Sequence, residues 1–127
     1  MDLHHIHIFA SDINRTLRWW KENLGARILY DGELAGSRNV LIGVGAGRGN
    51  VYDQPPTELS KSTVHHVGVR VENLRNQWMK LQKKGVSSPN GMREYGNWRY
   101  VMIAAPDNLL VELFEFDEST SPFNLDG

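Results

Sequence analysis

The chain has 127 residues, a length typical of a single globular domain. Fourteen basic and fifteen acidic residues give a formal net charge of −1, and the two signs are interspersed along the sequence. This balance gives no electrostatic basis for binding nucleic acid or an anionic membrane. The absence of cysteine excludes disulfides, thiolate metal ligands and cysteine nucleophiles.

The sequence shows no feature of a secreted or membrane-spanning protein. Met1 leads straight into a polar, histidine-rich segment, so we expect no signal peptide. No apolar run approaches the roughly 20 residues that a transmembrane helix requires. A chain without disulfides also suits a reducing compartment, and we therefore expect a cytoplasmic protein.

The first half of the chain predicts a strand, a helix and three more strands. The stretch HHIHIFASDI, residues 4–13, begins with alternating apolar residues, which is typical of a strand, and Asp12 can then cap a helix. The helix has an apolar stripe and ends near Gly25, a natural stop. The stripe consists of Ile13, Leu17, Trp20 and Leu24. Strands are predicted over residues 26–31, 38–44 and 50–54, with the turn AGRG before the last of them.

The second half repeats this pattern. HHVGVRVENL, residues 65–74, matches HHIHIFASDI position by position at a constant offset of 61 residues. Asn73 takes the capping place of Asp12, and Gly85 is the matching helix stop. The apolar stripe returns as Leu74, Trp78 and Leu81. Strands are predicted over residues 91–95, 98–104 and 109–116, with the turn PDN before the last of them.

Each half therefore predicts a β-α-β-β-β module. Module one covers about residues 3–55 and module two about residues 64–117. A linker of about residues 56–63 joins them, and a polar tail follows over residues 118–127. Because each module alone would expose one apolar sheet face, we expect both to pack into one α+β domain spanning residues 1–127.

Glu112 stands out because it lies inside the apolar run LLVELF. A buried carboxylate is costly unless it is paired, hydrogen-bonded or bound to a metal ion. One candidate partner is an arginine such as Arg38 or Arg99, although buried ion pairs often add little net stability. The other candidate is a metal ion held jointly with histidines.

Four motifs along the chain point to a family. They are HIHIFASDI, the WWKENLG of the first helix, HVGVRVENL and PDNLLVEL. Together, over residues 2–117, they resemble the vicinal oxygen chelate superfamily. This group includes glyoxalase I, methylmalonyl-CoA epimerase, extradiol dioxygenases, fosfomycin-resistance transferases and bleomycin-resistance proteins. The resemblance implies two tandem βαβββ modules that form one half-open barrel.

The resemblance also implies a metal site. Carried over position by position, the ligands would be His5, His66 and Glu112, and Glu112 would also be the catalytic residue that moves a proton. His7 lies on the same predicted strand face as His5 and is the alternative first ligand. Gly68 stands at the repeat position of His7, so the repeat favours His5. Two histidines and one carboxylate suit one divalent ion such as Fe, Mn, Ni or Zn, with coordination positions left open.

Other positions depart from the family pattern or are candidates to contact substrate. The fourth ligand of glyoxalase-like members falls on Asn50, a neutral and poor ligand. Asn50 and Tyr52 share one face of their predicted strand, and Trp98 and Tyr100 share one face of theirs. These four residues are the candidate substrate-binding residues, with core packing an equal alternative for Trp98. His65 is expected on the face opposite His66, as a packing or surface residue.

Two functions remain open from the sequence, and a third possibility is a former enzyme that keeps the ligand residues without turnover. The first is a small metal-dependent enzyme whose ion chelates adjacent oxygens of a small substrate, with lyase, isomerase, transferase and dioxygenase chemistry unresolved. The second is a metal-free protein of the bleomycin-resistance type that sequesters a small molecule. The resemblance also implies a homodimer, in which the site is either built within one chain or shared between two.

Overall fold

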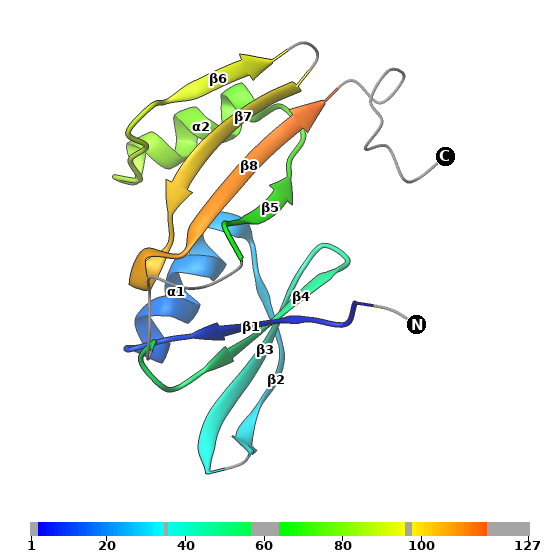
Figure 1. Cartoon of the computed structure of the whole chain (residues 1–127), viewed down its shortest axis with the longest axis vertical. Coiled ribbons are helices and arrows are strands. Elements are labelled where there is room, and N and C mark those ends of the chain that lie inside the picture. Colours follow the sequence, from blue (N-terminus) through cyan, green and yellow to red (C-terminus); the bar gives the residue numbers. More distant parts are fainter. Residues whose placement is uncertain (1–2, 35, 57–63, 96–97, 117–127) are drawn as a thin grey trace. The chain divides into compact units, whose positions relative to one another are not determined.

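A computed structural model describes residues 3–34, 36–56, 64–95 and 98–116 (Figure 1). The predicted tail and all of the predicted linker except Pro56 lie outside the described residues. The chain forms two compact units that correspond to the two predicted modules, and the turn Ala105–Asp107 groups with the first unit. Each module is described by itself.

Module one contains one helix and one mixed sheet. Its elements are β1 (Ile6–Phe9), α1 (Ile13–Leu24), β2 (Arg27–Leu34), β3 (Ser37–Val44) and β4 (Gly47–Tyr52). The strand order is β1-β4-β3-β2, with β1 parallel to β4 and the other neighbours antiparallel. Helix α1 returns the chain along the sheet, so that β2 runs in the same direction as β1. The two antiparallel connections from β2 to β3 and from β3 to β4 then make β4 parallel to β1.

Module two repeats this topology. Its elements are β5 (Val67–Arg70), α2 (Leu74–Lys83), β6 (Met92–Tyr95), β7 (Trp98–Ala104) and β8 (Leu110–Phe116), with the 3₁₀ turn η1 (Pro106–Asn108) between the last two strands. The strand order is β5-β8-β7-β6, and β5 is parallel to β8. The predicted α+β class and the two βαβββ modules are confirmed.

The helices begin and end where the sequence chemistry predicts. Asp12 accepts a hydrogen bond from the Arg15 backbone N–H at 3.1 Å, and Asn73 caps α2 in the same way. Gly25 ends α1 with a φ of +64°, a conformation that glycine adopts without strain. The predicted stripes are buried apart from Leu24, which lies in the last turn of α1 and is only half-buried.

The predicted AGRG turn is wrong. β3 and β4 are joined by the two-residue loop Gly45-Ala46, and Gly47 already pairs with Val44 in the ladder. Glycine favours this loop because Gly45 has a positive φ of +57°. Gly49 lies within the strand, where an added Cβ would come within 3.2 Å of the Ile8 side chain. A close approach of this kind explains a glycine inside a strand.

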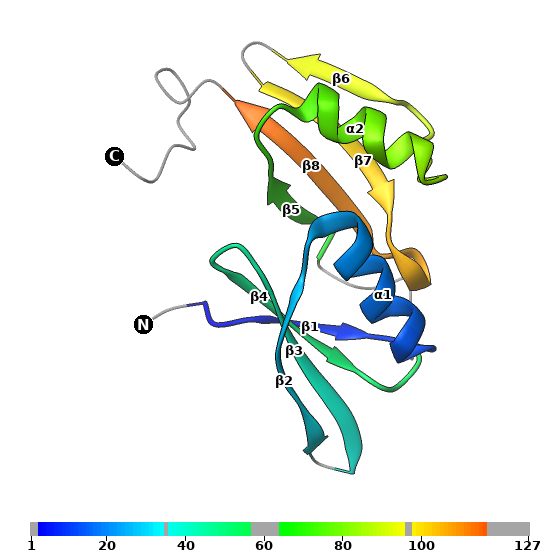
Figure 2. The ribbon, with the colours of Figure 1, turned by 180° about the vertical axis from the view of Figure 1, so that it is seen from behind.

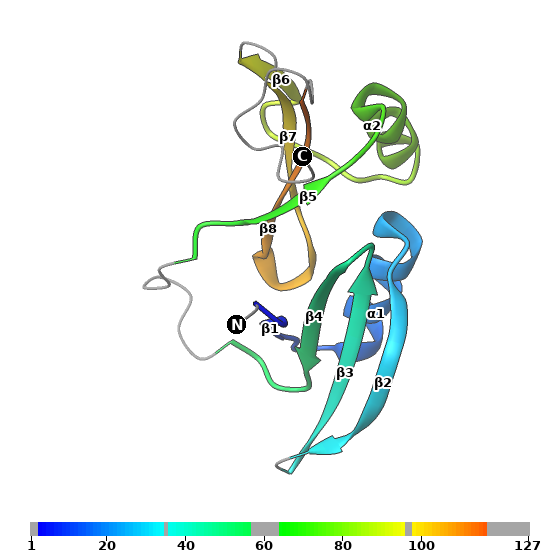
Figure 3. The ribbon, with the colours of Figure 1, turned by 90° about the vertical axis from the view of Figure 1, so that its right-hand side faces the viewer.

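Each sheet has one face against its helix and one helix-free face, as Figures 2 and 3 show for both modules. The residues that alternate toward the helices are buried, with exposures of 0–7%: Ile8, Val40, Ile42 and Val51 in module one, and Val101, Ile103, Val111 and Leu113 in module two. Strand alternation sends their neighbours, including Asn50 and Glu112, to the helix-free face. No helix in the described part of the chain is long and apolar enough to span a membrane.

Candidate metal and ligand site

The strand registers show which residues of the two modules are equivalent. In module two Gly68 of β5 is the register partner of Glu112 of β8. In module one His7 of β1 is the register partner of Asn50 of β4. His7 therefore occupies the position of Gly68, as the offset of 61 residues predicts, and Asn50 occupies the position of Glu112.

Glu112 lies beside His66 on the helix-free face of module two. The His66 Nε2 and Glu112 Oε2 atoms are 3.8 Å apart, and the Glu112 side chain is 16% exposed. This separation is longer than a hydrogen bond, so the two side chains are neighbours without a direct bond. An added Cβ at Gly68, the register partner of Glu112, would come within 3.2 Å of the Phe114 ring, so glycine leaves room for that ring.

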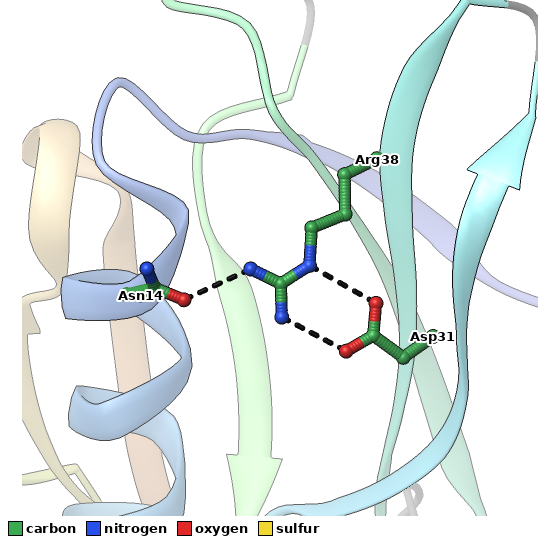
Figure 4. Close-up of polar contacts among 3 residues, drawn as sticks. All are labelled: Asn14, Asp31 and Arg38. Atoms are coloured by element: carbon green, nitrogen blue, oxygen red, sulfur yellow. Dashed lines mark hydrogen bonds and ion pairs between the residues drawn. The ribbon is translucent and has the colours of Figure 1, made fainter.

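The alternative arginine partners of Glu112 are bonded to other residues. Arg38 donates to both carboxylate oxygens of Asp31, at 3.0 and 2.8 Å, and to Asn14 Oδ1 at 2.9 Å (Figure 4). Arg99 donates to Glu115 Oε1 at 2.8 Å. Within the described part of the chain, Glu112 makes no ion pair with either arginine, so His66 is the titratable side chain beside it.

The two engaged arginines are themselves related by the repeat, at an offset of 61 residues. Arg38 joins the sheet of module one to Asn14 in the first turn of α1. In module two Glu115 bridges Arg99 and the Leu74 backbone N–H at the start of α2. The Leu74 N–H and then the Arg99 guanidinium hold the pKa of Glu115 below its ordinary value. Arg38 and Arg99 therefore help to connect the first turn of the helix in each module to its sheet.

Module one has a different arrangement at the equivalent position. Asn50 Nδ2 lies 3.3 Å from His7 Nδ1 and donates to Asn39 Oδ1 at 2.9 Å. Asn39 is buried, and its amide nitrogen donates to the backbone carbonyls of Leu34 and Ser37, both at 3.0 Å. Asn50 is therefore held by an amide network, which fixes its side chain.

A cluster of aromatic rings adjoins this network at His7, on the helix-free face. The ring of His7 lies 4.9 Å from that of Tyr52 and 5.4 Å from that of Phe9, centroid to centroid. Phe9 is 38% exposed, which is unusual for a phenylalanine. The sequence analysis selects Tyr52 but misses Phe9, although strand alternation with His7 could have indicated it. The three rings thus form one cluster, which touches Asn50 through His7.

The other two candidate substrate residues lie in β7. Tyr100 is half-buried and is the register partner of Phe114. Trp98 is the register partner of Phe116, and its side chain lies outside what the structure describes. Phe114 and Phe116 stack with ring centroids 5.9 Å apart, and the Arg70 guanidinium lies 5.0 Å over the Phe116 ring. The helix-free face of module two is therefore also aromatic.

Both candidate ligand histidines lie immediately before a strand and beside another histidine. His5 precedes β1, and its Nδ1 lies 2.9 Å from that of His4. His66 precedes β5, and its Nδ1 lies 2.7 Å from that of His65. His65 is exposed, as predicted for a surface residue, but the prediction that it lies on the face opposite His66 is wrong, because strand alternation does not yet apply at these positions.

The pair His66 and Glu112 fits the separation of two ligands on one ion. Two atoms that each bind an ion at about 2.0–2.2 Å can lie no more than about 4.4 Å apart. The observed 3.8 Å falls within this limit. No group of three or more His, Asp or Glu side chains suited to a metal forms among the described residues.

Two βαβββ modules, each with polar groups on a helix-free face, define the class of the protein as an α+β fold built from a repeated unit. A family model, described as the Glyoxalase/Bleomycin resistance protein/Dioxygenase superfamily, matches residues 2–113. The chain belongs to this superfamily. No curated protein matches it in sequence.

Solved structures show the same fold. A glyoxalase family protein from Enterococcus faecalis is similar with a TM-score of 0.76 and 22% identity, over 90% of this chain and 97% of that one. The antibiotic-binding protein TnmS3 from Streptomyces sp. CB03234 is similar with a TM-score of 0.78 and 18% identity, over 92% of this chain and 97% of that one. The fosfomycin resistance protein FosX from Listeria monocytogenes, in complex with Mn(II) and sulfate ion, has a TM-score of 0.72 and 17% identity. The match covers 91% of this chain and 93% of that one. At these identities the likeness shows the fold alone.

Proposed function

We propose that the protein is a metal-dependent enzyme acting on a small substrate with two adjacent oxygens. His5, His66 and Glu112 would hold one divalent ion of Fe, Mn, Ni or Zn. When bound, the ion would supply Lewis-acid stabilisation of charge that develops on the substrate oxygens. The Mn(II) complex of FosX supports a metal in this fold.

The chain's own residues would have separate roles. His66 would bind through Nε2, the atom that faces Glu112. Glu112 would bind through Oε2 and would also accept and return a proton of the substrate at that carboxylate. Asn50 and Tyr52 of module one would contact the substrate, with Trp98 and Tyr100 of module two. Their aromatic faces suit an apolar or planar substituent.

The observation that carries the proposal is the partner of Glu112. A largely buried carboxylate needs compensation. The candidate arginines Arg38 and Arg99 are bonded to Asp31 and Glu115, whereas Glu112 lies 3.8 Å from a histidine nitrogen. An ion between these two atoms would compensate the charge and would use a lone pair of the ring.

The test is the metal content and metal affinity of the purified protein beside those of Glu112→Gln. We expect about one divalent ion per chain in the wild type and its loss in the variant, because glutamine removes the charge but keeps the shape. Glu33→Gln is the matched control, since Glu33 is an exposed strand glutamate. A wild type that takes up none of Fe(II), Mn(II), Ni(II) or Zn(II) would rule out the proposal.

Module one favours a second candidate function, a metal-free binding protein. Asn50 is a poor ligand that donates to Asn39, and the neighbouring His7 ring forms an aromatic cluster with Phe9 and Tyr52. Such a surface can stack on a planar molecule. TnmS3, which is described as an antibiotic-binding protein, shares the fold. Saturable binding of an aromatic compound by metal-free protein, weakened by Tyr52→Ala and unchanged by Glu112→Gln, would support this function.

We further propose a homodimer in which His5 of one chain meets His66 and Glu112 of the other. The support is the chain's membership of the superfamily, the resemblance to which implies a homodimer. A two-fold dimer would then contain two equivalent sites.

A further inference from the structure

Each module places a second histidine against its candidate ligand histidine. In module two the rings of His65 and His66 lie 5.0 Å apart at 85°, with their Nδ1 atoms at 2.7 Å. In module one the rings of His4 and His5 lie 5.2 Å apart at 87°, with their Nδ1 atoms at 2.9 Å. The same edge-to-face pair thus occurs twice at equivalent positions.

The position of the pairs explains how adjacent residues can touch. Within a strand, neighbouring side chains point to opposite faces of the sheet. Both pairs precede the paired strands, because β1 begins at Ile6 and β5 begins at Val67. The backbone before the ladder is free of that alternation, so the two rings can turn toward each other.

The contact has a consequence for the ring nitrogens of His66. A neutral imidazole carries one proton, and the bond made at one nitrogen decides which nitrogen keeps a lone pair. Nδ1 of His66 faces His65, whereas Nε2 faces Glu112 Oε2 at 3.8 Å. If Nδ1 of His66 carries the proton and donates it in a hydrogen bond to His65, Nε2 keeps its lone pair and can bind a metal ion. Partners of this kind orient ligand histidines in metal sites.

We propose that His65 and His4 are positioning residues, each of which accepts a hydrogen bond from Nδ1–H of the ligand histidine that follows it. This bond fixes the ring orientation and the tautomer in which Nε2 binds a divalent transition ion. The inference rests on the proposed function, because it concerns the same site. Neither residue touches the ion or the substrate.

The affinity test uses Zn(II) as the probe, titrated by calorimetry into the full-length protein. Loss of such a second histidine costs about 10–100-fold in metal affinity, so we expect His65→Phe to bind Zn(II) about 10–100-fold more weakly. His65→Asn keeps an acceptor oxygen close to the place of Nδ1, and it should retain nearly the wild-type affinity. His4→Phe and His4→Asn should behave in the same way. The unfolding midpoint of each variant serves as the folding control, since both histidines are exposed.

The second readout is nuclear magnetic resonance of protein with ¹⁵N-labelled histidine. We expect a scalar coupling between the two Nδ1 atoms across the hydrogen bond in the metal-free protein, and a protonated Nδ1 on His66 in the Zn(II) form. Zn(II) binding that is equally tight in the wild type and in His65→Phe would overturn the inference but leave the proposed metal site standing. A missing Nδ1–Nδ1 coupling would also overturn it. A wild type that binds no metal would overturn the proposed function as well.

Discussion

Asn50 of β4 occupies in module one the position that Glu112 of β8 occupies in module two. The two side chains have different surroundings. Glu112 faces a histidine nitrogen at 3.8 Å, whereas Asn50 donates to the buried amide oxygen of Asn39 at 2.9 Å. The duplicated fold therefore uses equivalent positions for different purposes, an ionisable group in one module and a fixed neutral amide in the other.

We predict that Asn50→Asp destabilises the protein by about 1–3 kcal/mol, the cost of leaving a buried polar group without its partner. Aspartate has no N–H to donate to Asn39 Oδ1. Asn39 cannot turn its amide to compensate, because its nitrogen already donates to two backbone carbonyls. Urea unfolding at neutral pH measures the difference. Asn90→Asp, at an exposed loop position, should change stability by no more than about 0.5 kcal/mol, and an equal loss in both variants would contradict the explanation.

A second prediction concerns the acid stability that Glu115 provides. The Leu74 N–H at 2.5 Å and the Arg99 guanidinium at 2.8 Å lower the pKa of Glu115 from its ordinary value of 4.5. A carboxyl group whose pKa is lower in the native state stabilises the fold above the unfolded-state pKa. This contribution is lost as the pH falls from that value through the native pKa.

Glu115→Gln should therefore be less stable than the wild type at neutral pH, and its stability should fall less steeply below about pH 4.5. Thermal unfolding of both proteins across the acid range measures this difference. Glu33→Gln is the control and should follow the wild-type curve, because Glu33 is exposed on β2. Parallel curves for wild type and Glu115→Gln would show that the hydrogen bonds seen here do not stabilise the charged form.

A third prediction tests the packing of α2. Leu74 is fully buried at the start of this helix, with 0% exposure. Leu74→Ala should cost about 2–5 kcal/mol, because it removes buried apolar surface and leaves a cavity. Met79→Ala, on the same helix but 50% exposed, should change stability by less than about 0.5 kcal/mol. Chemical denaturation measures the free energy of unfolding of both variants. Similar losses in the two would mean that α2 does not pack through its apolar stripe of Leu74, Trp78 and Leu81.

A fourth prediction tests the proposed sharing of the site between chains. His5→Ala and Glu112→Ala should each lose metal binding on their own. In a mixed dimer of the two variants, one site would combine both lesions and the other would be wild type. We therefore expect metal binding to return after the two variants are unfolded and refolded together. If binding fails to return in dimers shown to be mixed, the ligands come from one chain.

The sequence predicted most of the fold from local signals. The helix caps Asp12 and Asn73, the stripe Leu74, Trp78 and Leu81, and the two modules are all confirmed. These features depend on residues a few positions apart, whose spacing directly reflects helix and strand geometry. The AGRG turn was wrong because glycine occurs both in reversals and at close approaches inside strands, and local chemistry does not separate the two uses.

For the candidate site, the sequence by itself determined that His5 and His66 are equivalent, because the repeat aligns them at an offset of 61 residues. The equivalence of Asn50 and Glu112 comes from the strand registers. Only the tertiary structure decided which side chains meet. It placed His66 beside Glu112, bonded Arg99 to Glu115 and turned His65 toward His66. The physical reason is that such contacts depend on strand register and on where each ladder begins. A shift of one residue sends a side chain to the other face of the sheet.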